Sequence, residues 1–334
     1  MRAFFSAHPE LRATPLTQVL SLQHTSGLAS LHVKDESGRF GLNAFKLLGA
    51  RFAIETLMAE GAVARGDVLA CASEGNHGRA VARAAREVGC RARVYMAHDA
   101  AQARVDAIAS EGAEVVRVEG SYDDAVRVLQ ADADAHGWTI ISDTAWPGYE
   151  RVPRLIMLGY ARLLDEITAA TDLDVVLVQG GVGGLLCGVA SWCAMHRPGI
   201  KVVCVEPASA ACLQASARAG HPIAVTGPLT TAMAGLRNRE VSPLAFESAR
   251  STVDAFVAID DEWTERAMRV LHGVGIGAGA SGAAALGGLI AICEDPSMAS
   301  VRDALALGPS ARVVAIVSEG VTDPVHWHSV VRPA

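Results

Sequence analysis

Aromatic residues are scarce in this chain of 334 residues, at 5%, and charged residues make up only 19%. With 51% hydrophobic residues, the composition is ordinary for a globular protein. No apolar run approaches the length of about 18 residues that a membrane helix needs, so we expect no membrane span. The N-terminal stretch MRAFFSAHPELR lacks the apolar core of a secretory signal. A chain of this length is expected to form two domains.

Paired cysteines and clustered positive charge are also lacking. The seven cysteines are scattered and form no CxxC pair, which disfavours a zinc site and a disulfide scaffold. Several lie in apolar runs, such as Cys71 and Cys204, where we expect buried, reduced thiols and hence a cytoplasmic protein. The formal net charge is −7 and no basic cluster offsets it, so nucleic-acid binding is not expected.

One stretch, residues 34–54, organises the chain. Residues 31–36 alternate apolar and polar as a half-buried strand does, and from residue 44 apolar residues recur at helical spacing. Lys46 lies where that helix begins. A lysine is poorly placed there for stability, because the helix dipole favours anions. The same environment lowers the pKa of a lysine, as a Schiff-base nucleophile requires. A lone lysine is usually a surface residue, so this role needs support from other motifs.

Strands alternating with helices predict parallel βαβ units, and hence an α/β fold of two doubly wound open-sheet domains. We expect a large domain formed by 1–44 and 151–334 and a small inserted domain, 45–150. Ser121 and Asp124 are spaced as a capping box at the start of one helix. The remaining expected strands cover 67–73, 91–97, 113–119, 139–143, 174–179, 201–207, 255–259 and 312–320.

Three segments are less regular. Residues 144–167 are expected to form one long helix that leads the chain back to the large domain. The stretch 214–251 is hard to interpret, with loop-like Gly, Asn and Pro residues in its second half. Residues 275–288 form a glycine-rich run without clear periodicity.

The segment QGGVGG, residues 179–184, follows an apolar strand and opens a helix. Backbone N–H groups and the helix dipole bind phosphate at such a place, and glycines let the backbone approach the anion. A dinucleotide loop is an alternative. The GxGxxG pattern fails at Leu186, but Glu206 lies about where a ribose-binding acid would fall. A plain turn is the third interpretation.

The other polar positions have structural interpretations when taken alone. Residues 73–78, SEGNHG, suit a turn that caps a helix, and Asp143 suits an N-cap after a strand. Ser318 can be a simple strand-end hydroxyl. His326 and His328 have no third ligand nearby in the sequence, so we expect them at the surface rather than on a metal.

Taken together, the motifs resemble one family. Five motifs occur in the order found in the diaminopropionate ammonia-lyases: KDES-RFGLNAFK at 34–46, ASEGNHGRAVA at 72–82, DTAW-GYE from Asp143, T-MAGL at 231–236 and SEGVTDP at 318–324. The resemblance implies the pyridoxal-phosphate-dependent fold type II, similar to the β subunit of tryptophan synthase. It covers nearly the whole chain and favours the phosphate-binding interpretation of residues 180–184.

The resemblance also implies how the cofactor is held. Lys46 is implied to form the Schiff base with pyridoxal phosphate, and Asn76 to contact the ring hydroxyl of the cofactor. Ser318 is implied to contact the pyridine nitrogen. A hydroxyl there leaves that nitrogen largely unprotonated, which favours β-elimination over transamination or racemisation. The phosphate is implied to lie on Gly180, Gly181, Val182, Gly183 and Gly184.

Further residues are implied to serve the substrate. Ser73, Gly75 and His77 are implied to bind it, and Asp143 to face its leaving amino group. Glu74 stands where the family usually has aspartate. An acid there can take the α-proton from the face opposite the lysine, which allows D- as well as L-substrates. Glu74 keeps the acid but places it one methylene further out.

The function expected from the resemblance is an elimination that converts 2,3-diaminopropionate to pyruvate and ammonia, in a cytoplasmic homodimer. Two activities on the same fold stay open, a serine/threonine-type dehydratase and a β-replacement synthase. An NAD-dependent dehydrogenase is a distant alternative, which would use residues 180–184 and Glu206 but leave Lys46 idle. A non-catalytic regulator on the same scaffold is the last alternative.

Overall fold

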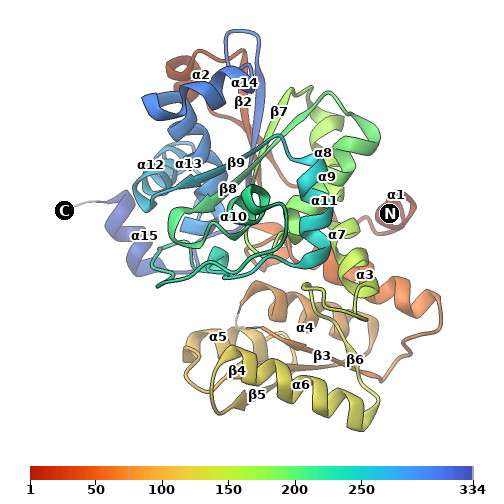
Figure 1. Cartoon of the computed structure of the whole chain (residues 1–334). Helices are drawn as coiled ribbons and strands as arrows, with labels where there is room; N and C mark the ends of the chain where they lie inside the picture. Colours follow the sequence, from red (N-terminus) through yellow and green to blue (C-terminus); the bar gives the residue numbers. More distant parts are fainter. Residues whose placement is uncertain (74, 333–334) are drawn as a thin grey trace. The chain divides into compact units, whose positions relative to one another are not determined.

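The structure is a computed structural model that describes residues 1–73 and 75–332. Contacts between residues divide it into two compact units. Unit 1 comprises Met1–Leu11 and Lys46–Tyr160, and unit 2 comprises Arg12–Phe45 and the described chain from Ala161 onward. The predicted α/β class with parallel sheets is confirmed, because each unit is built on one such sheet (Figure 1).

Unit 2 contains a six-stranded sheet in the order β1-β2-β10-β7-β8-β9. Only the edge strand β1 is antiparallel to its neighbour. The strands are rich in valine, whose branched side chain suits a sheet covered on both faces. Their bounds are Leu16–Gln18 for β1, Ser30–Asp35 for β2, Val175–Gln179 for β7, Lys201–Pro207 for β8, Ala255–Ile259 for β9 and Arg312–Val317 for β10.

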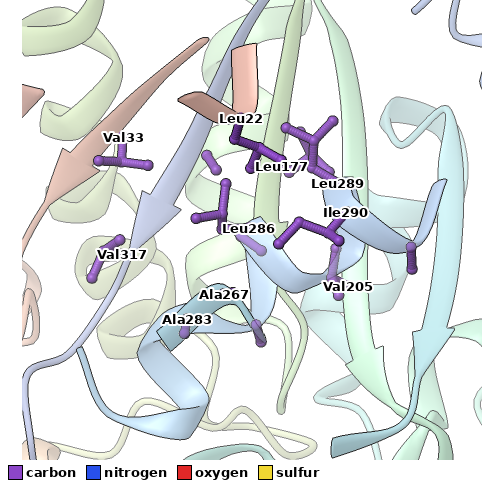
Figure 2. Close-up of a cluster of buried hydrophobic side chains, with 14 of the residues drawn as sticks. Leu22, Val33, Leu177, Val205, Ala267, Ala283, Leu286, Leu289, Ile290 and Val317 are labelled. Carbon is purple, nitrogen blue, oxygen red and sulfur yellow. The ribbon is translucent and has the colours of Figure 1, made fainter. Parts of the chain in front are cut away.

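The core of unit 2 is centred on α13, Ala280–Glu294, which packs on β7, β8, β9 and β10. Nearly every residue of this helix is buried. Figure 2 shows Leu286 and Ile290 of α13 gathered with Leu177 and Val205 of the sheet. The glycine-rich run 275–288 is therefore largely the first half of a buried helix. Its glycines serve close approach, since a Cβ on Gly288 would lie 2.5 Å from the Val205 side chain.

Other helices complete unit 2. In Figure 1, α12 lies with α13 on one face of the sheet, and α9 and α11 lie on the other. The bounds are Leu20–Ser26 for α2, Arg162–Ala170 for α8, Gly184–His196 for α9, Cys212–Ala219 for α10, Pro243–Thr252 for α11, Asp261–Gly273 for α12, Ala299–Ala304 for α14 and Pro324–Val331 for α15. Within the described chain, no helix is long and apolar enough to cross a membrane.

Unit 1 contains a parallel four-stranded sheet in the order β5-β4-β3-β6. The predicted capping box of Ser121 and Asp124 is confirmed at the start of α6. The strands are Val68–Ala72 (β3), Arg91–Ala97 (β4), Ala113–Val118 (β5) and Thr139–Ile140 (β6), and the helices are Arg2–Ala7 (α1), Leu47–Ala59 (α3), Asn76–Val88 (α4), Gln102–Ala109 (α5), Tyr122–His136 (α6) and Arg151–Tyr160 (α7).

Two expectations for residues 139–167 are wrong. The expected strand 139–143 ends at Ile140, where the Tyr149 hydroxyl donates to the Ile140 carbonyl and accepts from the Ser142 N–H. The expected helix 144–167 begins only at Arg151 and is broken at Ala161. Gly148 adopts a left-handed φ of 85°, which an α-helix cannot accommodate.

A buried network of charges braces unit 2 beside the segment that leads to Lys46. Glu166 accepts from Lys34 Nζ at 2.6 Å and from Arg39 Nη2 at 2.6 Å. Arg39 also pairs with Glu36, which accepts a hydrogen bond from Thr14. The side chains of Lys34, Glu36, Arg39 and Glu166 are at most 1% exposed. Such charges tolerate burial only while every partner is present.

We expect Glu166→Ala to lower the free energy of unfolding by about 3–5 kcal/mol, because it leaves buried Lys34 without its carboxylate partner and Arg39 with Glu36. Urea unfolding followed by circular dichroism measures the change. Glu265→Ala is the control, since its pair with Arg269 is solvent-exposed and is worth about 1 kcal/mol or less. Equal losses in the two variants would contradict a structural role for the network.

Candidate functional site

In unit 1, Lys46 meets the predicted residue Asp143. Lys46 is the N-cap of α3, as predicted, and its Nζ lies 2.6 Å from Asp143 Oδ2. Asp143 follows β6 in the chain, so residues 97 positions apart are brought together at one sheet end. The two side chains are 23% and 17% exposed, which leaves the pair partly accessible. An amine and a carboxylate this close can each release the other and bind a different group of opposite charge.

The electrostatics of the pair keep Asp143 ionised. Burial alone raises the pKa of its carboxyl, but the electrostatic influence of His77 and of Lys46, with the hydrogen bond from Lys46, holds that pKa below the usual range. Asp143 is therefore an anion at neutral pH and a poor proton donor. It is suited to hold a cation rather than to protonate a leaving group.

The predicted residue His77 lies beside the same pair. Its Nε2 is 2.8 Å from the carbonyl oxygen of Ile141, which can only accept, so Nε2 carries the proton. Its Nδ1 is then an unprotonated nitrogen, 3.7 Å from Asp143 Oδ2. Burial lowers the pKa of His77, which keeps the ring neutral. Lys46, Asp143 and His77 thus form one cluster in unit 1.

The other lysines have structural partners. The chain has only three lysines, at 34, 46 and 201. Lys34 is buried between Glu166 and the carbonyl of Thr14. Lys201 donates to the carbonyl of Ala304 at 2.7 Å. Lys46 differs from Lys34 in exposure, because its side chain is 23% exposed beside Asp143 whereas that of Lys34 is 1% exposed.

The predicted loop 73–78 leads into α4. The Ser73 hydroxyl accepts from the N–H groups of Gly75 and Gly78, at 3.3 and 3.0 Å, and so organises the start of this helix. Gly75 is exposed and Asn76 is half-buried at the first turn. Glu74 lies outside the described residues.

In unit 2, the glycine loop Gly180–Gly184 joins β7 to α9, as predicted. A Cβ on Gly180 would meet the side chains of Cys204 and Glu206 at 2.6 and 2.7 Å. Gly183 has a left-handed φ of 96°, and a Cβ there would lie 2.7 Å from that of Ala245. Side chains are therefore excluded at Gly180 and Gly183, which leaves the backbone bare at these two positions.

The backbone of the glycine loop offers hydrogen-bond donors. The N–H of Gly180 donates to the Val205 carbonyl. Within residues 1–73 and 75–332, the N–H groups of the loop residues 181–184 have no acceptor. They lie at the N-terminus of α9, where the helix dipole favours an anion. The geometry suits a phosphate group.

Glu206, which the dinucleotide alternative assigns to ribose binding, has a structural role. It is fully buried and accepts from the backbone N–H groups of Leu213 and Gln214, both at 2.8 Å, at the start of α10. Burial raises its pKa to about 7. A carboxyl so occupied is not free to bind a ribose, and this disfavours the dehydrogenase alternative.

Ser318 follows β10 in unit 2 and is 5% exposed. Its carbonyl accepts from the N–H of Phe45 at 3.4 Å, and Gly320 donates to the carbonyl of Asn43 at 2.8 Å. Among the residues described, the Ser318 hydroxyl has no hydrogen-bond partner. It remains available to a ligand.

Three further residues were not predicted. Tyr160 ends α7 with its ring near Lys46. Asn238 lies over the glycine loop, with Nδ2 3.0 Å from where a Cβ on Gly181 would be. Gln179 donates to the carbonyls of Gly282 and Ile316, and so holds the end of β7. None of the three has a local sequence signal, because each acts through a partner distant in the chain.

His326 and His328 lie on α15, half-buried and exposed respectively. The TAMAGL segment, residues 231–236, ends in a short turn whose Gly235 N–H donates to Ser281 Oγ at 2.9 Å. Within the described ranges, no group of three His, Cys, Asp or Glu residues could hold a metal ion.

Unit 1 offers an amine beside a carboxylate, and unit 2 separately offers a glycine loop with backbone donors. An amine beside a carboxylate can form a carbon–nitrogen double bond with an aldehyde, and the glycine loop offers phosphate-binding N–H groups. Residues 8–319 match the family described as pyridoxal-phosphate dependent enzymes.

Comparison with individual relatives indicates which enzymes of this family the chain resembles. The diaminopropionate ammonia-lyase of Escherichia coli strain K12 is 38% identical over 357 residues, covering 99% of this chain and 90% of that protein. The crystal structure of the holo enzyme from Escherichia coli has a TM-score of 0.90 and 36% identity, covering 99% of this chain and 90% of that chain. The same enzyme in complex with an aminoacrylate-PLP azomethine reaction intermediate has a TM-score of 0.87 and 38% identity, covering 96% and 88%.

The chain belongs to the diaminopropionate ammonia-lyase family of pyridoxal-phosphate-dependent enzymes. The family and the fold class predicted from the motifs are therefore confirmed, and with them the cofactor.

The raised pKa of Glu206 predicts a pH-dependent stability. The folded protein holds this proton up to about pH 7, whereas the unfolded chain releases it near 4.5. Rising pH between these values therefore favours unfolding of the wild type. Because Glu206→Gln cannot titrate, we expect its stability relative to the wild type to increase by about 3 kcal/mol across that interval. Urea unfolding at several pH values measures this.

Glu265→Gln serves as the control, because it removes an exposed carboxylate on α12. It should follow the pH dependence of the wild type. A Glu206→Gln curve parallel to the wild-type curve would show that burial does not retain the proton.

Proposed function

We propose that the protein is a pyridoxal-phosphate-dependent ammonia-lyase that converts 2,3-diaminopropionate and water to pyruvate and two molecules of ammonia. The observation that carries this proposal is the contact between Lys46 and Asp143, 2.6 Å apart in unit 1. It supplies an amine for the cofactor and an anion for the substrate. The relatives named above support the choice of substrate.

The residues that hold the cofactor are proposed as follows. The Lys46 amine binds its aldehyde carbon, and Asn76 and Ser318 contact its ring. The phosphate is bound by the N–H groups of the glycine loop Gly180–Gly184, where bulkier residues do not fit. When bound, pyridoxal phosphate withdraws electrons from the α-carbon of an attached amino acid and makes its proton acidic.

Two residues are proposed to take the α-proton. The Lys46 amine, once the amino group of the substrate has replaced it, is free to act as a base on one face. Glu74 is proposed to serve the opposite face, and so to allow the D-isomer. Ser73, Gly75 and His77 are proposed to lie at the substrate, with the first turn of α4 facing its carboxylate.

Asp143 is proposed to bind the β-ammonium of the substrate. Its carboxylate is held ionised by Lys46 in the present structure. While the cofactor aldehyde occupies the Lys46 amine, Asp143 lacks its ammonium partner and is proposed to attract the β-ammonium of the arriving substrate. A hydroxyl leaving group needs a proton donor instead, and an acid with a lowered pKa donates poorly. Asp143 therefore favours loss of an amine over loss of water, and the ammonia-lyase over the dehydratase.

The assembly and location are also proposed. We propose a homodimer, as the fold usually forms, and a cytoplasmic protein whose thiols stay reduced. All seven cysteines are free, and six of them are buried. Sedimentation equilibrium tests the dimer, because a mass near the 34.8 kDa of one chain would refute it.

The cofactor role of Lys46 is tested with Lys46→Ala. We expect loss of turnover and loss of the cofactor label that borohydride reduction fixes on the peptide containing residue 46. Lys201→Ala is the matched control, because Lys201 donates to the backbone carbonyl of Ala304. It should retain both label and turnover. Turnover near the wild-type level in Lys46→Ala would refute the assignment.

The substrate is tested by pyruvate and 2-oxobutyrate release from L- and D-diaminopropionate, L-serine and L-threonine. We expect kcat/KM for either diaminopropionate well above that for both hydroxy amino acids. Asp143→Asn should lose most activity on diaminopropionate, about a hundredfold or more, because the charge partner of the β-ammonium is removed. Activity confined to serine or threonine would instead identify a dehydratase.

Glu74→Gln extends the same assay. It should reduce turnover of the D-isomer more than that of the L-isomer, because only one face loses its base. Equal losses would refute the opposite-face role of Glu74.

A further inference from the structure

Tyr160 is the buried neighbour of Lys46 that has no role in the scheme above. It is the last residue of α7, and its side chain is fully buried. The Nζ atom of Lys46 lies 5.7 Å from the centroid of its ring, within the range of a cation–π contact. Both residues belong to unit 1.

Two glycines bring the ring to this place. A Cβ on Gly49, three residues after Lys46, would lie 2.5 Å from Tyr160 Cε1. A Cβ on Gly159 would lie 2.6 Å from the Leu48 carbonyl oxygen and 2.8 Å from the Gly49 Cα. The backbones of α3 and α7 therefore touch where they cross. Any larger residue at either glycine would move the ring away from the first turn of α3, which carries Lys46.

The Tyr160 hydroxyl is suited to hold an amine without taking its proton. Burial raises its pKa well above the usual value of a tyrosine, so the phenol stays neutral at neutral pH. The charge of Lys46 opposes that rise in pKa and the charge of Asp143 adds to it. Asp143 then remains the one anion in contact with Lys46 among the described residues.

We propose that Tyr160 is a positioning residue for Lys46. Its ring limits the rotation of the lysine side chain, and its neutral hydroxyl orients the amine, while the Gly49–Gly159 contact fixes the distance. The inference rests on the proposed role of Lys46 as the residue that binds the cofactor. It adds a residue whose function is to keep that amine in place for attachment and for proton transfer.

The test compares Tyr160→Phe with the wild type. The cofactor-free proteins are mixed with pyridoxal phosphate in a stopped-flow instrument, and the band of lysine-bound cofactor is followed. We expect the attachment rate to fall about five- to tenfold, the effect of removing one buried polar group from beside a charge. We also expect kcat on diaminopropionate to fall by a similar factor with KM little changed, because Tyr160 acts on Lys46 and not on the substrate.

Tyr95→Phe is the matched control. Tyr95 is also fully buried in unit 1, and its hydroxyl bonds Asp132 on α6, so this variant loses a buried hydroxyl elsewhere. It should attach the cofactor at the wild-type rate. A wild-type rate in Tyr160→Phe, or equal slowing in both variants, would overturn the inference.

Failure of the proposed function gives a different result. If Lys46→Ala still acquires the borohydride-fixed label, Lys46 is not the attachment residue, whatever Tyr160→Phe does. If Lys46→Ala acquires no label but Tyr160→Phe matches the wild type, the proposed function stands and only the positioning role fails.

Discussion

The buried charge network of Glu36, Arg39 and Glu166 is the constraint on which unit 2 depends. It joins the end of β2 to α8 and leaves the chain in a fixed position as it runs toward Lys46. Because charges buried without partners are strongly destabilising, few other arrangements of this segment are tolerated. Because these charges must stay paired, the network fixes the backbone path of the segment that precedes Lys46.

Much of the fold follows from signals that are local in the sequence. The capping residues Ser121 and Asp124 predict a helix, and valine-rich runs bounded by glycine predict the strands. The glycine loop Gly180–Gly184 follows the same logic, because a strand, several glycines and a helix suffice to form an anion site. Lys46 could be placed at a helix start by periodicity alone, and the family motifs then gave it a chemical role.

Features that depend on distant partners could not be predicted. Gly49 and Gly159 look like ordinary helix glycines until the structure places them against each other. Glu206 resembles a ribose-binding acid, and only its hydrogen bonds to α10 show that it is a cap. Helix α13 is apolar on all sides, so its sequence has no periodicity to detect. Tertiary contacts decide all three cases.

The strand order of unit 2 has a consequence for how the protein is made. β10 lies between β2 and β7, although it is the last strand in the chain. On the ribosome, β2 and β7 each emerge with one edge unpaired, and both edges stay open until residues 312–317 have been synthesised. The sheet of unit 1, in contrast, lies within the continuous stretch 68–140 and can close early. Incomplete chains therefore expose unpaired strand edges in unit 2. These edges are prone to aggregation, so they are the part of the nascent chain that chaperones have most need to protect.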